Sequence, residues 1–183
     1  MEANLKIDEL WSEWEQSEKS PKDMGTVEMI VRRPQVDVRE EVKEAEFDTK
    51  DGLVGDNWLA RGSSSRPDGS PHPESQITLM NSRVIQLLAG DRSRWELAGD
   101  QLFVDFDLSK DNLPIGQRIK IGDVVLEIPE LPHTGCAKFA KRYGAHARKF
   151  VMTDEGKLLR FRGVYATVIQ GGNIKLTDTI TKL

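Results

Sequence analysis

The spacing of apolar residues changes several times along this chain of 183 residues, and each spacing predicts a different element. Near the N-terminus, apolar side chains recur every three or four residues, which is the period of one helix face. Residues 4–16 are therefore predicted to form a short amphipathic helix that packs across the domain. Its apolar face consists of Leu5, Ile7, Leu10, Trp11 and Trp14.

Most later apolar positions alternate with polar ones, which is the pattern of half-buried strands. Val27, Met29 and Val31 alternate in the segment that ends at Pro34, and we expect them on one side of a strand. Further strands are expected around Val36, Val38, Val42 and Phe47, over residues 77–80, and through Leu102, Val104 and Phe106.

Two pairs of turn residues predict hairpins. Gly122-Asp123 and Gly171-Gly172 each separate two alternating segments. Strands outnumber helices and recur at short intervals, which favours a mainly β fold, an antiparallel β-barrel with a few peripheral helices, over a repeated strand–helix–strand unit. We predict a barrel domain over residues 24–183, preceded by a helical extension over residues 1–23.

Polar caps and glycines place two further helices and one long loop. Asn81 or Ser82 is expected to cap a helix that follows the strand over residues 77–80. A second helix should begin after Cys136, with Gly144 ending its first part. The segment 61–75 is dominated by Ser, Pro and Gly, and it fits either a mobile surface loop or an active-site flap.

Composition narrows the class of protein. The chain is 38% hydrophobic and 31% charged, which is ordinary for a globular domain. It has no apolar run of membrane-spanning length, and its first ten residues lack the apolar segment of a signal peptide. A single cysteine cannot form an internal disulfide, which fits a reducing compartment. We therefore expect a cytoplasmic protein without a membrane partner.

Charge is distributed very unevenly. The formal net charge of −4 argues against nucleic acid as the main ligand, because phosphate backbones need a basic face. Residues 1–60 hold 16 acidic and 8 basic residues, whereas residues 131–163 hold 8 basic residues against Asp154 and Glu155. Cys136 thus lies in the electropositive part of an acidic protein.

The role of Cys136 is the central question. Pro132 and Gly135 place it on a turn that leads into a helix, where the helix dipole and the nearby Lys138 and Arg142 favour a thiolate. A thiolate can bind a soft metal, carry sulfur as a persulfide or attack an electrophile. The residues alone leave open, and even favour, an inert core cysteine.

Other kinds of catalytic site find little support. His133 and Cys136, three residues apart, could share a zinc ion with His72 or His146, but a second cysteine and an HExxH motif are both missing. The sequence also lacks the local signatures of papain-like enzymes, the Walker A loop and the G-x-S-x-G motif.

The cations after the cysteine suggest an anionic ligand. Those of the predicted helix lie at several helical angles, so some must face solvent. Arg160 and Arg162 alternate with Phe161 in a predicted strand and could converge on one side. Because guanidinium groups bind phosphate bidentately, a thiol among cations fits an anion with a sulfur-seeking end. Asp56 and Asp100, each in a Gly-Asp pair, are expected to form turns rather than act as acids.

Taken in order, several segments resemble the MOSC domain, which occurs at the carboxyl end of molybdenum cofactor sulfurases, in amidoxime-reducing components and in small stand-alone bacterial proteins. The likeness extends from residue 24 to the end and is strongest to the stand-alone type. It depends on the ordered set rather than on one motif. The segments are "GLVGDNW" (52–58), "QITLMN" (76–81), "AGDQL" (98–102), "LPIGQRIKIGDVVLEI" (113–128), "TGCAKF" (134–139) and "RGVYATVIQGGNIKLTD" (162–178).

The resemblance implies a barrel of the pyruvate kinase barrel-like type, with a site built around Cys136. It implies that this cysteine accepts sulfur or ligates molybdenum in a pterin cofactor, with which some family members reduce N-hydroxylated compounds. Basic residues would bind the pterin phosphate. The implied cofactor-binding residues are Lys138, Arg160 and Arg162, with Arg61, Ser63 and Asn81 at the cofactor rim.

The sequence departs from the family pattern in two respects. Trp58 stands where stand-alone relatives often have His, which puts a metal or acid–base role there in doubt. Neither a pyridoxal-phosphate domain nor an iron–sulfur domain is present in the sequence. Pyridoxal phosphate would therefore act only through a partner cysteine desulfurase, and electrons would come from a partner protein.

Three hypotheses follow. The first is binding of a molybdenum–pterin cofactor through the Cys136 thiolate, for reduction of N-hydroxylated compounds or for sulfur handling. The second is a metal-free sulfur carrier that accepts persulfide from a cysteine desulfurase. The third is a non-catalytic binding module on a barrel scaffold.

Overall fold

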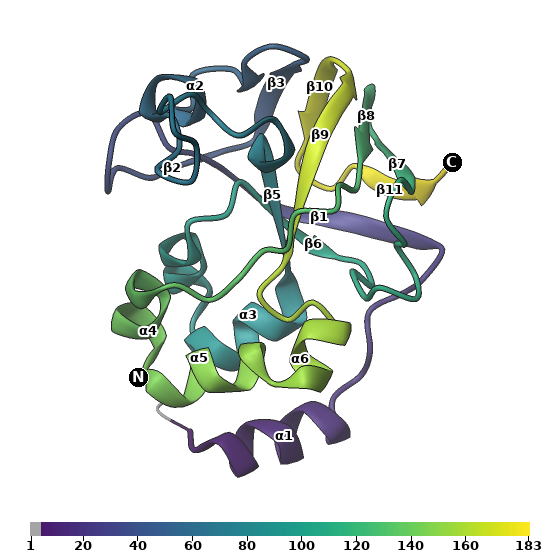
Figure 1. The fold of residues 1–183 in the computed structure, drawn as a ribbon. Coiled ribbons are helices and arrows are strands. Elements are labelled where there is room, and N and C mark those ends of the chain that lie inside the picture. Colours follow the sequence, from purple (N-terminus) through teal and green to yellow (C-terminus); the bar gives the residue numbers. More distant parts are fainter. Residues whose placement is uncertain (1–4) are drawn as a thin grey trace.

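The predicted N-terminal helix is confirmed, but it begins at Ile7, so Leu5 lies before it. The computed structural model describes residues 5–183, and within them α1 spans Ile7–Gln16 (Figure 1). Leu10 on its apolar face is fully buried. The ring of Trp11 packs edge-on against Phe150, with centroids 4.6 Å apart. Of the predicted extension over residues 1–23, residues 1–4 lie outside the described part of the chain.

Seven strands close into a barrel, and one more strand extends its edge (Figure 1). The barrel is closed by pairing between β11 and β1. The short strand β2 (Glu40–Val42) pairs with β1 and continues the sheet beyond it. One pair, β5–β6, is parallel, so the predicted antiparallel barrel is a closed barrel of mixed strand direction. In order, its strands are β11 (Thr179–Lys182), β7 (Arg118–Ile121), β8 (Val124–Glu127), β9 (Val164–Gln170), β5 (Ile77–Asn81), β6 (Leu102–Asp105) and β1 (Met24–Arg32).

A second, small sheet contradicts the hairpin predicted at Gly171-Gly172. β10 (Gly172–Lys175) pairs with β3 (Glu44–Asp48), which pairs in turn with β4 (Gly52–Leu53). A Cβ on Gly171 would lie 2.6 Å from the backbone oxygen of Phe47, so the glycine lets the chain cross closely onto β3 instead of folding back on β9. The hairpin at Gly122-Asp123 is confirmed as β7–β8.

Helices cover one side of the barrel (Figure 1). Asn81 caps α3 as predicted, and Gly144 ends α4. The short α2 (Trp58–Arg61) and the 3-10 helix η1 (Pro73–Ser75) flank an irregular loop. The covering helices are α1, α3 (Ser82–Ala89), the 3-10 helix η2 (Arg92–Ala98), α4 (Ala137–Tyr143), α5 (Ala145–Met152) and α6 (Asp154–Leu158).

Two hydrophobic cores lie on opposite faces of β1, which overturns one prediction. Val27 belongs to the core inside the barrel, whereas Met29 and Val31 belong to the core beneath the helices. The pairing of β1 with β6 shifts register between Val27 and Met29. One extra residue in a strand exchanges the faces of all that follow, so alternation alone could not place these three side chains together.

The strand predicted around Val36 and Val38 is also wrong. Both side chains are exposed in a turn where Asp37 has φ 62°. The strands around Val42 and Phe47 are confirmed as β2 and β3. Among the described helices, none is long and apolar enough to cross a membrane.

Candidate functional site

Cys136 stands at the end of an irregular segment that is held at several points. After β8 the chain crosses the molecule and enters α4 (Figure 1). The backbone nitrogen of Leu131 donates to Glu74 Oε2 at 3.0 Å, and Arg148 Nε donates to the Gly135 oxygen at 3.0 Å. Cys136 itself is exposed at the N-cap position of α4. The alternative of a buried core position for this cysteine is therefore wrong.

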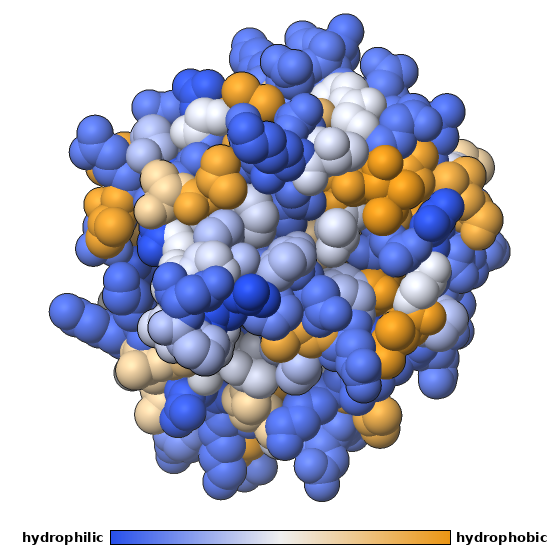
Figure 2. Space-filling model, turned by 45° about the horizontal axis from the view of Figure 1, so that its top comes forward, coloured by the Kyte–Doolittle hydropathy of each residue, from blue (hydrophilic) through white to orange (hydrophobic). Residues whose placement is uncertain are grey.

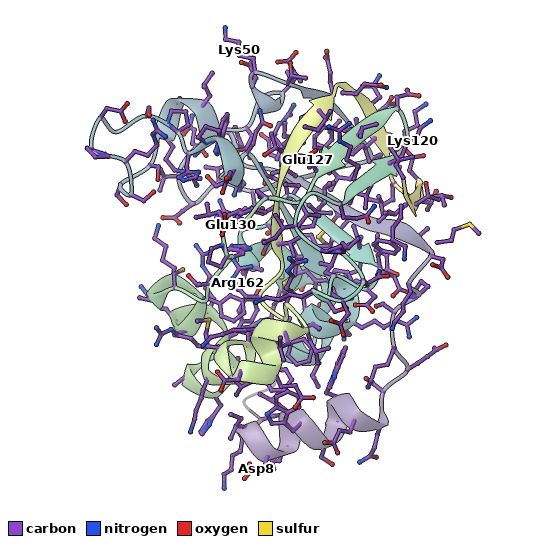
Figure 3. All side chains as sticks on the ribbon, turned by 45° about the vertical axis from the view of Figure 1, so that its right-hand side comes forward. Asp8, Lys50, Lys120, Glu127, Glu130 and Arg162 are labelled. Carbon is purple, nitrogen blue, oxygen red and sulfur yellow. The ribbon has the colours of Figure 1, made fainter. Side chains whose placement is uncertain are left out.

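Arg162 forms a buried ion pair behind this segment. Its Nη1 donates to Asp100 Oδ2 at 2.8 Å and its Nη2 to the Ala98 oxygen at 3.1 Å. The side chain of Asp100 is 0% exposed, and Figure 3 shows Arg162 between the barrel and the helices. Arg160 and Arg162 precede β9 in a turn rather than lying in the predicted strand, because Arg160 has φ 51°.

His133 packs into the same buried cluster. Its Nδ1 lies 3.7 Å from Asp100 Oδ1, and its ring stacks on Tyr165 with centroids 4.4 Å apart. Burial first, then the charges of Arg162 and Arg33, lower the pKa of His133 well below its usual value. Burial raises the pKa of Asp100 against the opposing effect of Arg162. His133 is thus neutral at neutral pH, and its contact with Asp100 is not an ion pair.

Asp56 holds a second buried arginine. Arg33 Nε donates to Asp56 Oδ2 at 2.8 Å and its Nη2 to Asp56 Oδ1 at 2.9 Å, a bidentate pair. Asp56 was expected only to form a turn, as was Asp100. The backbone nitrogen of Asp56 does form a turn by donating to the Leu53 oxygen. The carboxylates of Asp56 and Asp100, however, also pair with buried arginines. Trp58 is buried and donates to Ser75 Oγ at 3.4 Å.

Three arginines meet around Gly99. Arg33 Nη1 donates to the Gly99 oxygen at 2.7 Å, and the guanidinium groups of Arg39 and Arg142 flank the same residue. Burial, followed by the charges of Arg142 and Arg33, lowers the pKa of Arg39. Asp37, 3.2 Å from Arg142 Nη2, is an exposed carboxylate beside them. Positive charge therefore predominates here.

Arg61 joins Cys136 around Tyr165. Arg61 ends α2, and among the described residues no hydrogen bond or ion pair engages its guanidinium group. Although Arg61 is exposed, partial desolvation, then the charge of Arg33, lowers its pKa. Burial raises the pKa of Tyr165, and the charges of Arg61 and Cys136 also act on it. Lys138 is exposed and lies 3.9 Å from Asp37, the carboxylate that also pairs with Arg142.

Arg160 faces a neighbouring cavity instead. Its Nη1 donates to the backbone oxygens of Leu108 at 3.3 Å and Leu113 at 2.6 Å. Arg160 and Arg162 both line this cavity, whose volume is about 490 Å³, and His133 and Tyr165 line it as well.

The structure gives Ser63 and Asn81 local roles. Ser63 Oγ lies 2.7 Å from Ser65 Oγ within the loop after α2. Asn81 Oδ1 accepts from the Val84 nitrogen at 3.0 Å, while its Nδ2 donates to Ser20 Oγ and the Phe106 oxygen. The side chain of Asn81 is therefore engaged in capping α3 and joining it to the barrel.

A zinc site finds no support in the geometry. Among residues 5–183, no three His, Cys, Asp or Glu side chains are grouped so that they could hold a metal ion. His72 Nδ1 accepts from the backbone nitrogen of Glu74 at 3.3 Å and caps η1.

Sequence reasoning missed four members of the site. Arg33 and Arg39 lie about a hundred residues before Cys136, and Tyr165 looked like an ordinary strand residue. Asp100 was seen only as part of a turn. A signal did exist: two Gly-Asp pairs in a chain rich in arginine offered carboxylates suited to buried guanidinium groups.

The sequence matches a family model described as the MOSC domain over residues 69–181, more than half of the chain. The chain belongs to the MOSC domain family. No curated protein matches this MOSC protein. Among solved structures it is similar to the YuaD protein from Bacillus subtilis, with a TM-score of 0.62, 17% identity, and coverage of 87% of this chain and 95% of that one.

YiiM from Escherichia coli is similar at a TM-score of 0.56 and 16% identity, covering 86% of this chain and 69% of that one. For YiiM from Geobacillus stearothermophilus the TM-score is 0.54 and the identity 15%, with 87% and 75% covered. These similarities establish the fold of the MOSC protein.

Proposed function

We propose that this MOSC protein binds a molybdenum–pterin cofactor, with the Cys136 thiolate as metal ligand. The family is associated with molybdenum cofactor binding or sulfur handling. The observation that carries the proposal is an exposed single cysteine at the start of α4, the helix whose Arg142 meets Arg33 and Arg39 around Gly99, in a protein of net charge −4.

The donor set suits both ends of such a cofactor. Thiolate is a soft ligand that suits molybdenum, and guanidinium forks suit a phosphate group. Arg39 Nε is buried without a hydrogen-bond partner among the described residues, and Arg61 is unpaired there. Arg33 and Arg162 are already neutralised by Asp56 and Asp100. We assign the metal to Cys136, and the phosphate to Arg39 and Arg61 with help from Arg142 and Lys138.

Tyr165 is the residue that would serve the reaction. Reducing an N-hydroxylated compound to an amine and water consumes two electrons and two protons; the cofactor, when bound, supplies the electrons, which it receives from a partner protein. Burial raises the pKa of Tyr165, so its hydroxyl stays protonated at neutral pH. It can donate one proton to the leaving substrate hydroxyl and regain it from solvent, which also supplies the second proton to the nitrogen. Neutral His133, stacked on its ring, holds the tyrosine in place.

The exposure of Cys136 also supports a second candidate. A persulfide carrier needs a thiol that reaches the active site of a partner, here a pyridoxal-phosphate-dependent cysteine desulfurase. Such a protein would hold one extra sulfur on Cys136 and no molybdenum.

Metal analysis separates these functions. Wild type, Cys136→Ser, Arg61→Gln and the control Lys141→Gln are purified anaerobically from a cofactor-producing host, and molybdenum per chain is measured by mass spectrometry. Lys141 is exposed on α4 outside the arginine group, so its loss should change nothing. We expect about one molybdenum per wild-type and control chain, less in Arg61→Gln and none in Cys136→Ser.

Molybdenum absent from wild type would reject cofactor binding. One additional sulfur in the intact mass, lost in Cys136→Ser, would then identify the carrier. If the wild type carries neither molybdenum nor an additional sulfur, a non-catalytic binding module is the remaining function.

A further inference from the structure

The cavity beside the cysteine has apolar walls. Apolar side chains from four separate segments line its volume of about 490 Å³, a size typical of sites for small organic molecules. Ile115 is 62% exposed, although aliphatic side chains of this size are usually buried. The apolar lining residues include Pro114, Ile115, Ile128, Leu131, Val151 and Val164.

Cations gather on one side of this cavity. Lys110, Lys157 and Arg160 all line it. Hydrogen bonds join the segments that carry them. The backbone nitrogen of Lys110 donates to the Leu158 oxygen at 2.9 Å, and Arg160 Nη1 donates to the segment 108–113. Glu130 is the acidic residue in the lining. Figure 3 shows Glu130 above Arg162, toward the barrel.

The guanidinium group of Arg160 has donors available for an anion. Its backbone has φ 51°, a conformation that costs energy for a residue with a side chain and that is common at ligand sites. Nη1 bonds backbone oxygens, whereas Nε and Nη2 bond none of the described residues. No described carboxylate lies within ion-pair distance of this guanidinium group, and Lys157 has only a loose, exposed pair with Asp154 at 3.8 Å.

Thr134 also lines the cavity and lies two residues before Cys136. Tyr165 lines the cavity, and its hydroxyl bonds none of the described residues. It is also close enough to Cys136 for the charge of the thiol group to act on it. The cavity lining therefore extends from the three cations to the segment that leads into Cys136. On the face of the molecule shown in Figure 2, apolar patches are separated by polar side chains.

We propose that this cavity binds a small organic anion. Its aliphatic or aromatic body contacts the apolar walls, and its carboxylate, or a group of similar charge, lies among Lys110, Lys157 and Arg160. This site is separate from the arginines assigned to the cofactor phosphate, and its occupancy does not depend on which chemistry Cys136 performs.

Octanoate is a suitable probe, because it combines an eight-carbon body with a carboxylate. Titration calorimetry at low ionic strength should show one octanoate per chain, with octan-1-ol binding at least tenfold more weakly. Arg160→Gln should weaken octanoate binding, but this variant also loses the bonds to segment 108–113 and can misfold. The double variant Lys110→Gln/Lys157→Gln changes exposed side chains only, and we expect about tenfold weaker binding with unchanged thermal stability.

Lys141→Gln, a cation outside the cavity, and Cys136→Ser should both bind octanoate as the wild type does. Retained octanoate binding in Cys136→Ser, together with lost molybdenum, would separate this site from the cofactor site. Absence of saturable binding, equal binding of octan-1-ol, or an unchanged affinity in the double lysine variant would each overturn the proposal.

Discussion

At the scale of single residues, the site depends on buried charges that compensate one another. Asp100 and Asp56 are fully buried, and each holds an arginine at 2.8 Å. Such pairs are costly to desolvate, and removing one partner leaves an isolated buried charge. His133 adds a neutral imidazole to the first of these pairs.

The burial of His133 predicts a pH dependence of stability. Because its pKa is lowered in the folded state, the unfolded chain binds more protons below the ordinary value of 6.5. The free energy of unfolding should therefore fall as pH drops below about 6.5, by up to about 1.4 kcal/mol per pH unit from this residue. The raised pKa of Asp100 acts with the opposite sign.

His133→Gln isolates this contribution, since Asp100 remains in the variant. Urea unfolding of wild type and variant between pH 7 and pH 5 should give a shallower decline with acidification in the variant, whatever its stability at pH 7. If the free energy of unfolding falls in parallel with pH in the two proteins, His133 has the same pKa in the folded and the unfolded state, which contradicts the prediction.

At the scale of elements, the turn before β9 sets the geometry of the site. It directs Arg160 to the cavity, Phe161 to the core beneath the helices and Arg162 to Asp100. The turn ends at Gly163, which has φ 92° and lies against β5: a Cβ there would be 2.2 Å from the Leu79 oxygen. Only glycine fits this approach without moving the strand.

Gly163→Ala should therefore be strongly destabilising. Gly116→Ala is a matched control, because Gly116 has φ 83° but open space around it. The control should cost about 1–2 kcal/mol for the left-handed backbone alone. Gly163→Ala should cost at least about 2 kcal/mol more, because it also displaces β5. Chemical denaturation measures both; equal losses would mean that the contact with Leu79 relaxes at no cost.

Elements with strong local signals could be predicted from the sequence, and those that depend on distant contacts could not. The α1 face, the Asn81 cap and the β7–β8 turn each depend on neighbouring residues. The bulge in β1 and the passage of Gly171 onto β3 depend on strands far away in the sequence. Local periodicity contains no information on such pairings.

At the scale of the whole molecule, the fold concentrates positive charge that the sequence disperses. Arg39 and Arg142 come from distant parts of the chain and flank Gly99, and the charge of Arg33 acts on both Arg39 and Arg61. The sequence revealed the basic stretch around the cysteine, but not the contribution of the acidic N-terminal third.

Ligation of the metal by Cys136 can be measured directly, because the chain has one thiol. Protein containing a known fraction of molybdenum is treated with iodoacetamide under native, anaerobic conditions, and the alkylated fraction is read from the intact mass. The account predicts that the protected fraction equals the molybdenum-containing fraction, and that removing the metal exposes every thiol. Complete alkylation of molybdenum-loaded chains would contradict it.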